Sequence, residues 1–125
     1  MKELYKIGGR VVQGEQRGEK LGFPTANMRL HKKIPEGIYA AQVSINGKVY
    51  NAATFVGSAK TFMQTQIQIE SFLFDFSGNL YGKWLTVRLY DKIRDNKKFD
   101  SVDELVMQMH EDVKKIKEFF IKQQD

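Results

Sequence analysis

The chain has 125 residues, 42% hydrophobic and 28% charged, which is enough for one domain with a single core and too short for two. It contains no cysteine, and this excludes a disulfide framework, a thiolate metal site and a cysteine nucleophile. We find no signal-peptide core and no apolar run of membrane-spanning length, so a soluble, cytoplasmic protein is expected.

The net charge of +5 is concentrated at the N-terminal end. Residues 1–33 contain eight Lys or Arg and three Glu, so the rest of the chain is neutral overall. A basic segment of this kind suits an anionic ligand, either a nucleotide phosphate or a nucleic-acid backbone. Charge alone does not separate these two classes.

Four or five short strands are predicted between residues 4 and 90. Asn46-Gly47 is a hairpin signal, because both residues tolerate the positive φ of a type I′ turn, so the strands on either side should pair antiparallel. A second hairpin is expected around Ser77-Gly78-Asn79, and residues 57–65 are expected to be a polar, mobile connection. Such short strands and tight turns predict a mainly β fold, with an antiparallel sheet closed or nearly closed as a barrel. The predicted strands are 4–13, 38–45, 49–56, 67–76 and 84–90.

The spacing of apolar residues changes after residue 100. Apolar residues then recur at steps of three and four, which places them on one face of a helix. Ser101 and Glu104 form a capping box at its start, and residues 121–125 are expected to fray. One C-terminal helix packed against the barrel is therefore predicted. Its apolar face consists of Val102, Leu105, Val106, Met109, Val113, Ile116, Phe119 and Phe120.

Residues 14–27 have the composition of a binding loop. Gly14 and Gly18 allow backbone N–H groups to approach a ligand, and Lys20 can neutralise phosphate charge. The spacing differs from the usual P-loop, because three residues separate the two glycines and Leu21 follows the lysine. An ordinary glycine-rich turn leading into a strand fits the same composition.

Pro24 stiffens the end of this loop. Thr25 and Asn27 follow it in an extended segment, and side chains two residues apart in such a segment point the same way. Their two neutral oxygens could share a Mg²⁺ ion that phosphates already ligate.

Glu70 stands in the predicted strand 67–76. Alternation along this strand places the carboxylate on one face together with glutamines and aromatic residues. An acid in this position lies either beside a ligand cavity or exposed at the rim of a barrel. The other members of this face are Gln66, Gln68, Phe72, Phe74 and Phe76.

These segments together resemble the ATP-dependent riboflavin kinases, including the kinase half of the bacterial bifunctional enzymes that also make FAD. The run GRVVQGEQRGEKLGFPTAN, from Gly9 to Asn27, is similar to the signature of that family. Further similar pieces follow in the family's order, and the resemblance covers about residues 5–117. These pieces are Gly37-Ile38-Tyr39-Ala40, Ile69-Glu70, Phe74-Asp75-Phe76, Leu80-Tyr81-Gly82, the run IRDNKKFDS from Ile93 to Ser101, and Glu104-Leu105.

The resemblance implies a Greek-key barrel of the riboflavin-kinase type with one C-terminal helix. It implies a single domain over residues 1–125, with the barrel at about 4–91, a flavin loop at about 92–100 and the helix at about 101–122. The implied reaction transfers the γ-phosphoryl group of Mg-ATP to the 5′-hydroxyl of riboflavin and yields FMN and ADP.

The resemblance also assigns roles to single residues. Glu70 would be the catalytic residue and would accept the proton of the 5′-hydroxyl. Thr25 and Asn27 would bind ATP and hold Mg²⁺ or another divalent cation. The other implied ATP-binding residues are Gly14, Gly18, Lys20 and Tyr81, and the implied flavin-binding residues are Arg94, Lys97 and Phe99.

Three residues depart from the family's usual pattern. Lys60 stands where a Pro is common, Phe72 where a His is common, and Asn96 where an acid is usual. No catalytic group is lost, so the departures bear on flavin affinity more than on the reaction type.

Two other functions fit parts of the sequence. A small basic barrel could bind single-stranded nucleic acid by stacking bases on Phe72, Phe74, Phe76, Trp84 and Tyr90. A flavin-binding relative could have kept the fold without turnover. On the kinase interpretation, neither a nucleic-acid nor a membrane partner is expected. The chain should be a monomer. In a full-length protein, an adenylyltransferase domain could accompany it.

Overall fold

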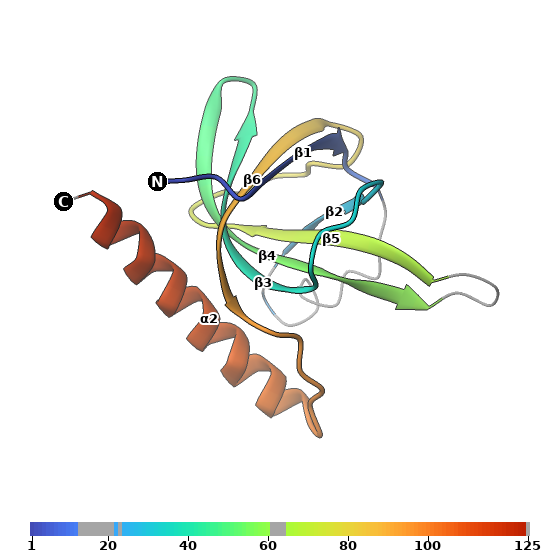
Figure 1. The fold of residues 1–125 in the computed structure, drawn as a ribbon, viewed down its shortest axis with the longest axis vertical. Coiled ribbons are helices and arrows are strands. Elements are labelled where there is room, and N and C mark those ends of the chain that lie inside the picture. Colours follow the sequence, from blue (N-terminus) through green and yellow to red (C-terminus); the bar gives the residue numbers. More distant parts are fainter. Residues whose placement is uncertain (13–21, 23, 61–64, 125) are drawn as a thin grey trace.

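The computed structural model describes residues 1–12, 22, 24–60 and 65–124, as six strands and one helix (Figure 1). Within these residues, no helix is both long and apolar enough to cross a lipid bilayer. The strands are β1 (Tyr5–Arg10), β2 (Ala26–Arg29), β3 (Gly37–Ile45), β4 (Lys48–Lys60), β5 (Thr65–Leu73) and β6 (Trp84–Arg94), and the helix is α2 (Val102–Gln123).

All six strands belong to one antiparallel sheet with the order β1-β6-β3-β4-β5-β2. The two outer strands approach each other beyond β1, where Val12 forms an isolated antiparallel bridge with Asn27. The Val12 amide donates a hydrogen bond of 2.8 Å to the Asn27 carbonyl. The sheet is therefore a nearly closed barrel, and the prediction of a mainly β barrel with one C-terminal helix is confirmed.

The first predicted hairpin is confirmed and the second is wrong. Asn46 and Gly47 have φ of 48° and 82°, as a type I′ turn requires, and β3 pairs with β4 along its whole length. In contrast, β5 pairs with β4 and β2, whereas β6 pairs with β1 and β3. Strand β5 ends at Leu73, and Asp75 then turns the chain with φ of 56°, so the segment before Trp84 passes to another part of the sheet.

Several strands are longer than their patterns indicated. β4 continues to Lys60 and β6 to Arg94, so much of the expected connection 57–65 is strand instead. The reason is pairing: residues 57–60 of β4 bond to residues 65–68 of β5, which hydropathy alone does not reveal. Residues 61–64 lie outside the described part of the chain.

Two apolar clusters stabilise the fold. The first fills the barrel and includes Met28, Tyr39, Val56 and Ile69, each exposed by at most 1%. The second lies outside the barrel, where α2 covers strands β3, β4 and β6 (Figure 1). It consists of Ile38, Ala40, Phe74, Ile116 and Phe120, with Ala53, Phe55, Phe72, Tyr90, Ile93, Val113 and Phe119 packed at its edge.

The helix begins as its capping residues predict. Ser101 Oγ accepts a hydrogen bond of 3.2 Å from the Glu104 amide, and Glu104 Oε2 accepts one of 3.2 Å from the Asp100 amide. The apolar face is buried mainly in its C-terminal half, whereas Val102 is exposed. The helix continues to Gln123, beyond the expected fraying point, because burial of Phe120 holds its last turns on the barrel.

Candidate functional site

Strands β2 and β5 bring Thr25, Asn27 and Glu70 together. Asn27 and Glu70 are direct partners across the antiparallel pair, and such partners project to the same face of a sheet. Thr25 lies two residues before Asn27, and its Oγ1 donates a hydrogen bond of 2.6 Å to Glu70 Oε1. The three oxygen-bearing side chains predicted to share a site are thus adjacent.

The carboxylate of Glu70 lies outside the barrel and not in its core. Its neighbours Ile69 and Ser71 point into the interior and are buried, whereas Glu70 and Thr25 are half-buried. On the other side, Glu70 is paired with Phe55 of β4. The acid therefore has a polar flank on β2 and an aromatic flank on β4, and part of it is open to a ligand.

Behind Glu70, the buried side of strands β4 and β5 contains a pair of polar side chains. Ser71 and Thr54 are partners across β5 and β4, both are fully buried, and their hydroxyl oxygens lie 2.8 Å apart in a hydrogen bond. Each hydroxyl satisfies the other, so the strand that carries Glu70 is tied to β4 by a side-chain bond as well as by its backbone.

The oxygen atoms of this site suit a hard divalent cation. Mg²⁺ prefers oxygen ligands and usually keeps phosphate or water in its coordination shell. A hydroxyl that donates to a carboxylate still has lone pairs to offer a cation, so the Thr25–Glu70 bond is compatible with metal binding. Among the described residues, no group of three or more His, Asp or Glu side chains could hold a metal ion, so a cation here would depend on the neutral oxygens of Thr25 and Asn27 and on phosphate.

Tyr81 is connected to this site through backbone contacts. The Gly82 amide donates to the Val11 carbonyl over 3.0 Å, and Val12 forms the bridge to Asn27. The Tyr81 side chain is 63% exposed beside this connection. Its position is compatible with the predicted contact to a nucleotide base, which stays a prediction.

Three of the predicted ATP-binding residues are not placed. Gly14, Gly18 and Lys20 lie outside the described residues. Their assignment continues to rest on the sequence.

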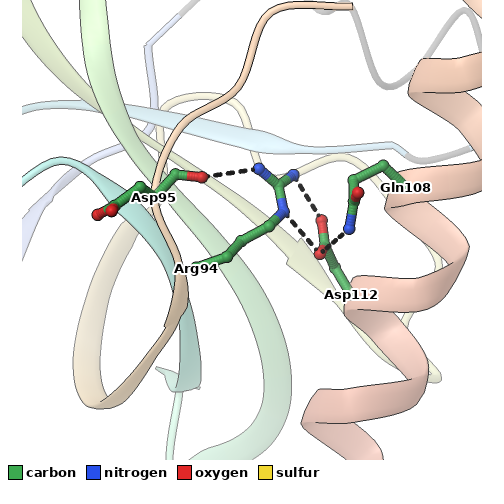
Figure 2. A network of polar contacts seen from close by, with 4 residues as sticks. All are labelled: Arg94, Asp95, Gln108 and Asp112. Atoms are coloured by element: carbon green, nitrogen blue, oxygen red, sulfur yellow. Dashed lines mark hydrogen bonds and ion pairs between the residues drawn. The ribbon is translucent and has the colours of Figure 1, made fainter.

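The predicted flavin loop begins where β6 ends. Arg94 donates from Nε to Asp112 Oδ1 over 2.8 Å and from Nη2 to Asp112 Oδ2 over 2.7 Å (Figure 2). Arg94 and Lys97 also approach the ring of Phe99, at 5.9 and 5.7 Å from its centroid. The three predicted flavin-binding residues therefore lie close together in space.

Asn96 ties this loop to the strand beside Glu70. Its Nδ2 donates a hydrogen bond of 3.2 Å to the Val56 carbonyl, and Val56 is adjacent to Phe55, the β4 partner of Glu70. An acid has no N–H to donate to that carbonyl, so this departure from the family's pattern provides a contact of its own.

Sequence reasoning missed Gln108 and Asp112, which support Arg94 from α2. A signal was present: Asp112 falls between Met109 and Ile116 on the predicted apolar face, where an acid is unusual. It is 4% exposed in the structure. A buried acid on a helix requires a partner, but the sequence does not indicate which of its 20 Lys and Arg residues supplies it.

The aromatic platform that nucleic-acid binding would need is not formed by the proposed side chains. Phe74 is buried under α2, Phe72 and Tyr90 pack at the edge of the same cluster, and Phe76 packs against Tyr50. Of these five described residues, only Trp84 is exposed. The helix covers the face on which bases were to stack.

A groove of about 500 Å³ lies at the C-terminal end of α2. Its lining includes Tyr50, Phe74, Lys117 and Phe120, and none of the predicted site residues that the structure describes. The groove is therefore separate from the group formed by Thr25, Asn27 and Glu70.

Comparisons with known proteins show the family to which this chain is similar. The family model described as Flavokinase: Riboflavin kinase matches residues 1–120. A bifunctional riboflavin kinase/FMN adenylyltransferase from Haemophilus influenzae is 40% identical over 119 residues, which are 93% of this chain. The chain spans 39% of the length of that relative.

Two solved structures share the fold. Riboflavin kinase from Trypanosoma brucei is 26% identical with a TM-score of 0.69, and the match covers 95% of this chain and 81% of that one. A protein from Streptococcus pneumoniae, described as a macrolide-efflux protein, is 39% identical with a TM-score of 0.80, over 87% of this chain and 37% of that one. Its description therefore refers to a protein of which this fold is one part. Given a family match over nearly its whole length, the chain belongs to the riboflavin kinase family.

Proposed function

We propose that this chain is a riboflavin kinase that transfers the γ-phosphoryl group of Mg-ATP to the 5′-hydroxyl of riboflavin. The observation that carries the proposal is the hydrogen bond from Thr25 to Glu70, with Asn27 directly opposite the acid. Residues 1–125 would act as a single riboflavin kinase-like domain.

In this reaction Glu70 is the general base. The 5′-oxygen of riboflavin forms a bond to the γ-phosphorus while the bond from that phosphorus to the bridging oxygen of ADP breaks. The hydroxyl proton passes to Glu70. Thr25 donates to Oε1 of the carboxylate, and Oε2 would accept the hydrogen bond from the substrate hydroxyl. The products are FMN and ADP.

The remaining task of the site is to align the reactants and neutralise charge, because phosphoryl transfer has a loose transition state. Thr25 and Asn27 would hold Mg²⁺ together with phosphate oxygens of ATP, and a bound Mg²⁺ supplies positive charge to the β- and γ-phosphates. Gly14, Gly18 and Lys20 would seat the phosphates, and Tyr81 would lie near the adenine.

Riboflavin would be bound between this site and the loop after β6. Phe99 offers an aromatic face to the isoalloxazine, and Arg94 and Lys97 offer positive charge to the new phosphate. The contact of Asn96 with Val56 supports this arrangement, because it fixes the start of the loop close to the strand pair that carries Glu70.

The wider setting of the reaction is also proposed. Because the reaction consumes ATP, we expect it in the cytoplasm, with the protein acting as a monomer. In a longer protein, an adenylyltransferase domain would use the FMN made here, as the description of the Haemophilus influenzae relative indicates for that enzyme. FAD synthesis is not proposed for these residues.

The decisive test is turnover by the purified protein. Riboflavin and Mg-ATP should yield FMN and ADP in equal amounts. Chromatography measures the FMN, and a coupled assay measures the ADP. Quenching of flavin fluorescence without ADP formation would instead indicate a binding protein without turnover. Salt-sensitive binding of a single-stranded oligonucleotide with no response to flavin would contradict the proposal.

A further inference from the structure

The strand end that opens the predicted flavin loop is held by the C-terminal helix. Both oxygens of Asp112 accept from the Arg94 guanidinium, in a two-bond arrangement that fixes the plane of the guanidinium as well as its position (Figure 2). The third contact of Arg94 is a bond of 3.0 Å from Nη1 to the Asp95 carbonyl. One side chain thus joins α2, the end of β6 and the backbone of the loop.

The carboxylate that performs this task is itself fixed. Asp112 is 4% exposed, and Gln108, one helical turn earlier, donates from Nε2 to its Oδ1 over 3.1 Å. Ile116, the next residue on the same face, is fully buried in the cluster between α2 and the barrel. The acid therefore has little freedom to follow a moving arginine.

Two further contacts hold the beginning of the loop. Asp95 forms an ion pair with Lys92, and Asn96 donates to the Val56 carbonyl of β4. Lys97 comes directly after Asn96 and Phe99 two residues later, and both Arg94 and Lys97 lie near the Phe99 ring. The aromatic ring therefore lies beside two cations, one of which is the guanidinium that Asp112 holds.

We propose that Asp112, oriented by Gln108, is a positioning residue for the flavin: it holds Arg94 so that the loop 94–99 is arranged before riboflavin binds. This inference rests on the proposed function. A loop that is already in its binding arrangement loses less conformational freedom when the ligand arrives. Asp112 should therefore govern riboflavin affinity without touching riboflavin, and it should have no effect on ATP affinity.

The test compares Asp112→Asn with Glu111→Gln in the full chain. Asparagine keeps the shape of the side chain but replaces one acceptor of the guanidinium with an N–H donor. We expect the riboflavin Kd, from flavin fluorescence, and the riboflavin KM to rise on the order of tenfold, with the KM for ATP unchanged. Glu111 is the exposed neighbouring acid, so its variant should match the wild type in all three values.

Rescue and coupling separate positioning from simple stability. Asp112→Glu keeps the charge and should recover part of the riboflavin affinity. Arg94→Lys keeps the positive charge but loses the two-bond geometry, and combining it with Asp112→Asn should add little to either single effect. Gln108→Ala, which leaves the ion pair intact, should shift the riboflavin Kd in the same direction by less.

Each outcome decides the inference. The riboflavin Kd and KM of Asp112→Asn are measured well below its Tm. If the Tm is lowered but both values match the wild type, Asp112 has a structural role only and the inference is overturned. Fully additive effects of the Arg94 and Asp112 variants would overturn it as well. A wild-type protein that neither binds riboflavin nor forms FMN would contradict the proposed function itself, which is a distinct result.

Discussion

Thr25 and Glu70 are 45 residues apart in the sequence, yet the Thr25 hydroxyl donates a hydrogen bond of 2.6 Å to the Glu70 carboxylate. The pairing of β2 with β5 produces this contact, because it places Asn27 opposite Glu70 and Thr25 at the adjacent end of the strand. The contact joins the residues proposed to hold the metal to the proposed general base. Changes at either residue should therefore affect the same reaction in different ways.

Glu70→Gln should remove turnover and leave flavin binding intact. Glutamine keeps an oxygen that can accept from Thr25, but it does not accept a proton from the substrate. We expect kcat to fall by about 10²–10⁴-fold, the usual contribution of a general base, with the riboflavin Kd unchanged. FMN formation and flavin fluorescence measure the two quantities. The matched control is Glu36→Gln, because Glu36 is an exposed acid that accepts from Ser58 over 2.8 Å; an undiminished kcat for the Glu70 variant would exclude this acid as the base.

Thr25→Val should weaken the use of Mg-ATP more than that of riboflavin. Valine has a similar shape but no hydroxyl for the cation or for Glu70. A hydrogen bond to a charged group contributes roughly 1.5–3 kcal/mol, so the KM for Mg-ATP and the Mg²⁺ concentration for half-maximal rate should rise at least about tenfold. Steady-state kinetics with Mg²⁺ titration measure both. Thr86→Val on β6 is the control, and an effect confined to the riboflavin KM would contradict the assignment of Thr25.

Thr54→Val should destabilise the barrel behind the site. The substitution leaves the fully buried Ser71 hydroxyl without its partner, which costs roughly 1–3 kcal/mol. Urea denaturation should show the lower free energy of unfolding. Adding Ser71→Ala removes the orphaned hydroxyl, so the double variant should be more stable than the sum of the two single effects predicts. Strictly additive losses would mean that the two hydroxyls do not depend on each other.

Asp95 should titrate below its usual value of 3.8. The hydrogen bond and the charge of Lys92 lower the pKa of Asp95, and the same contact raises the pKa of Lys92 above 10.5. Because the folded pKa of Asp95 is the lower one, its contribution to stability is present above about pH 3.8 and is lost as the pH falls through the folded value. NMR titration of the carboxyl group measures this pKa, and Lys92→Met should return it toward 3.8. Lys114→Met, on the exposed side of α2, should leave the pKa of Asp95 unchanged. A pKa of Asp95 at or above 3.8 in the wild-type protein would contradict the pairing with Lys92.

The sequence by itself determined the features that depend on neighbouring residues. The Asn46-Gly47 turn needs only two residues that accept positive φ, and the start of α2 needs only Ser101 and Glu104 at the correct spacing. The apolar period likewise located the helix. The family resemblance was recognisable for a similar reason, since its motifs are short runs in a given order.

Only the tertiary structure decided which distant groups meet. Strand β6 pairs with β1 and β3 and not with its sequence neighbour β5. The sequence does not reveal this pairing, because backbone hydrogen-bonding groups are alike in every strand and do not specify a partner. The Thr25–Glu70 contact follows from the pairing of β2 with β5. Asn96, which follows β6, reaches the Val56 carbonyl of β4 because β4 and β6 both pair with β3. The support of Arg94 by Asp112 required the helix to lie across the barrel, and the packing of Ile116 and Phe120 against the outer face of the sheet put it there.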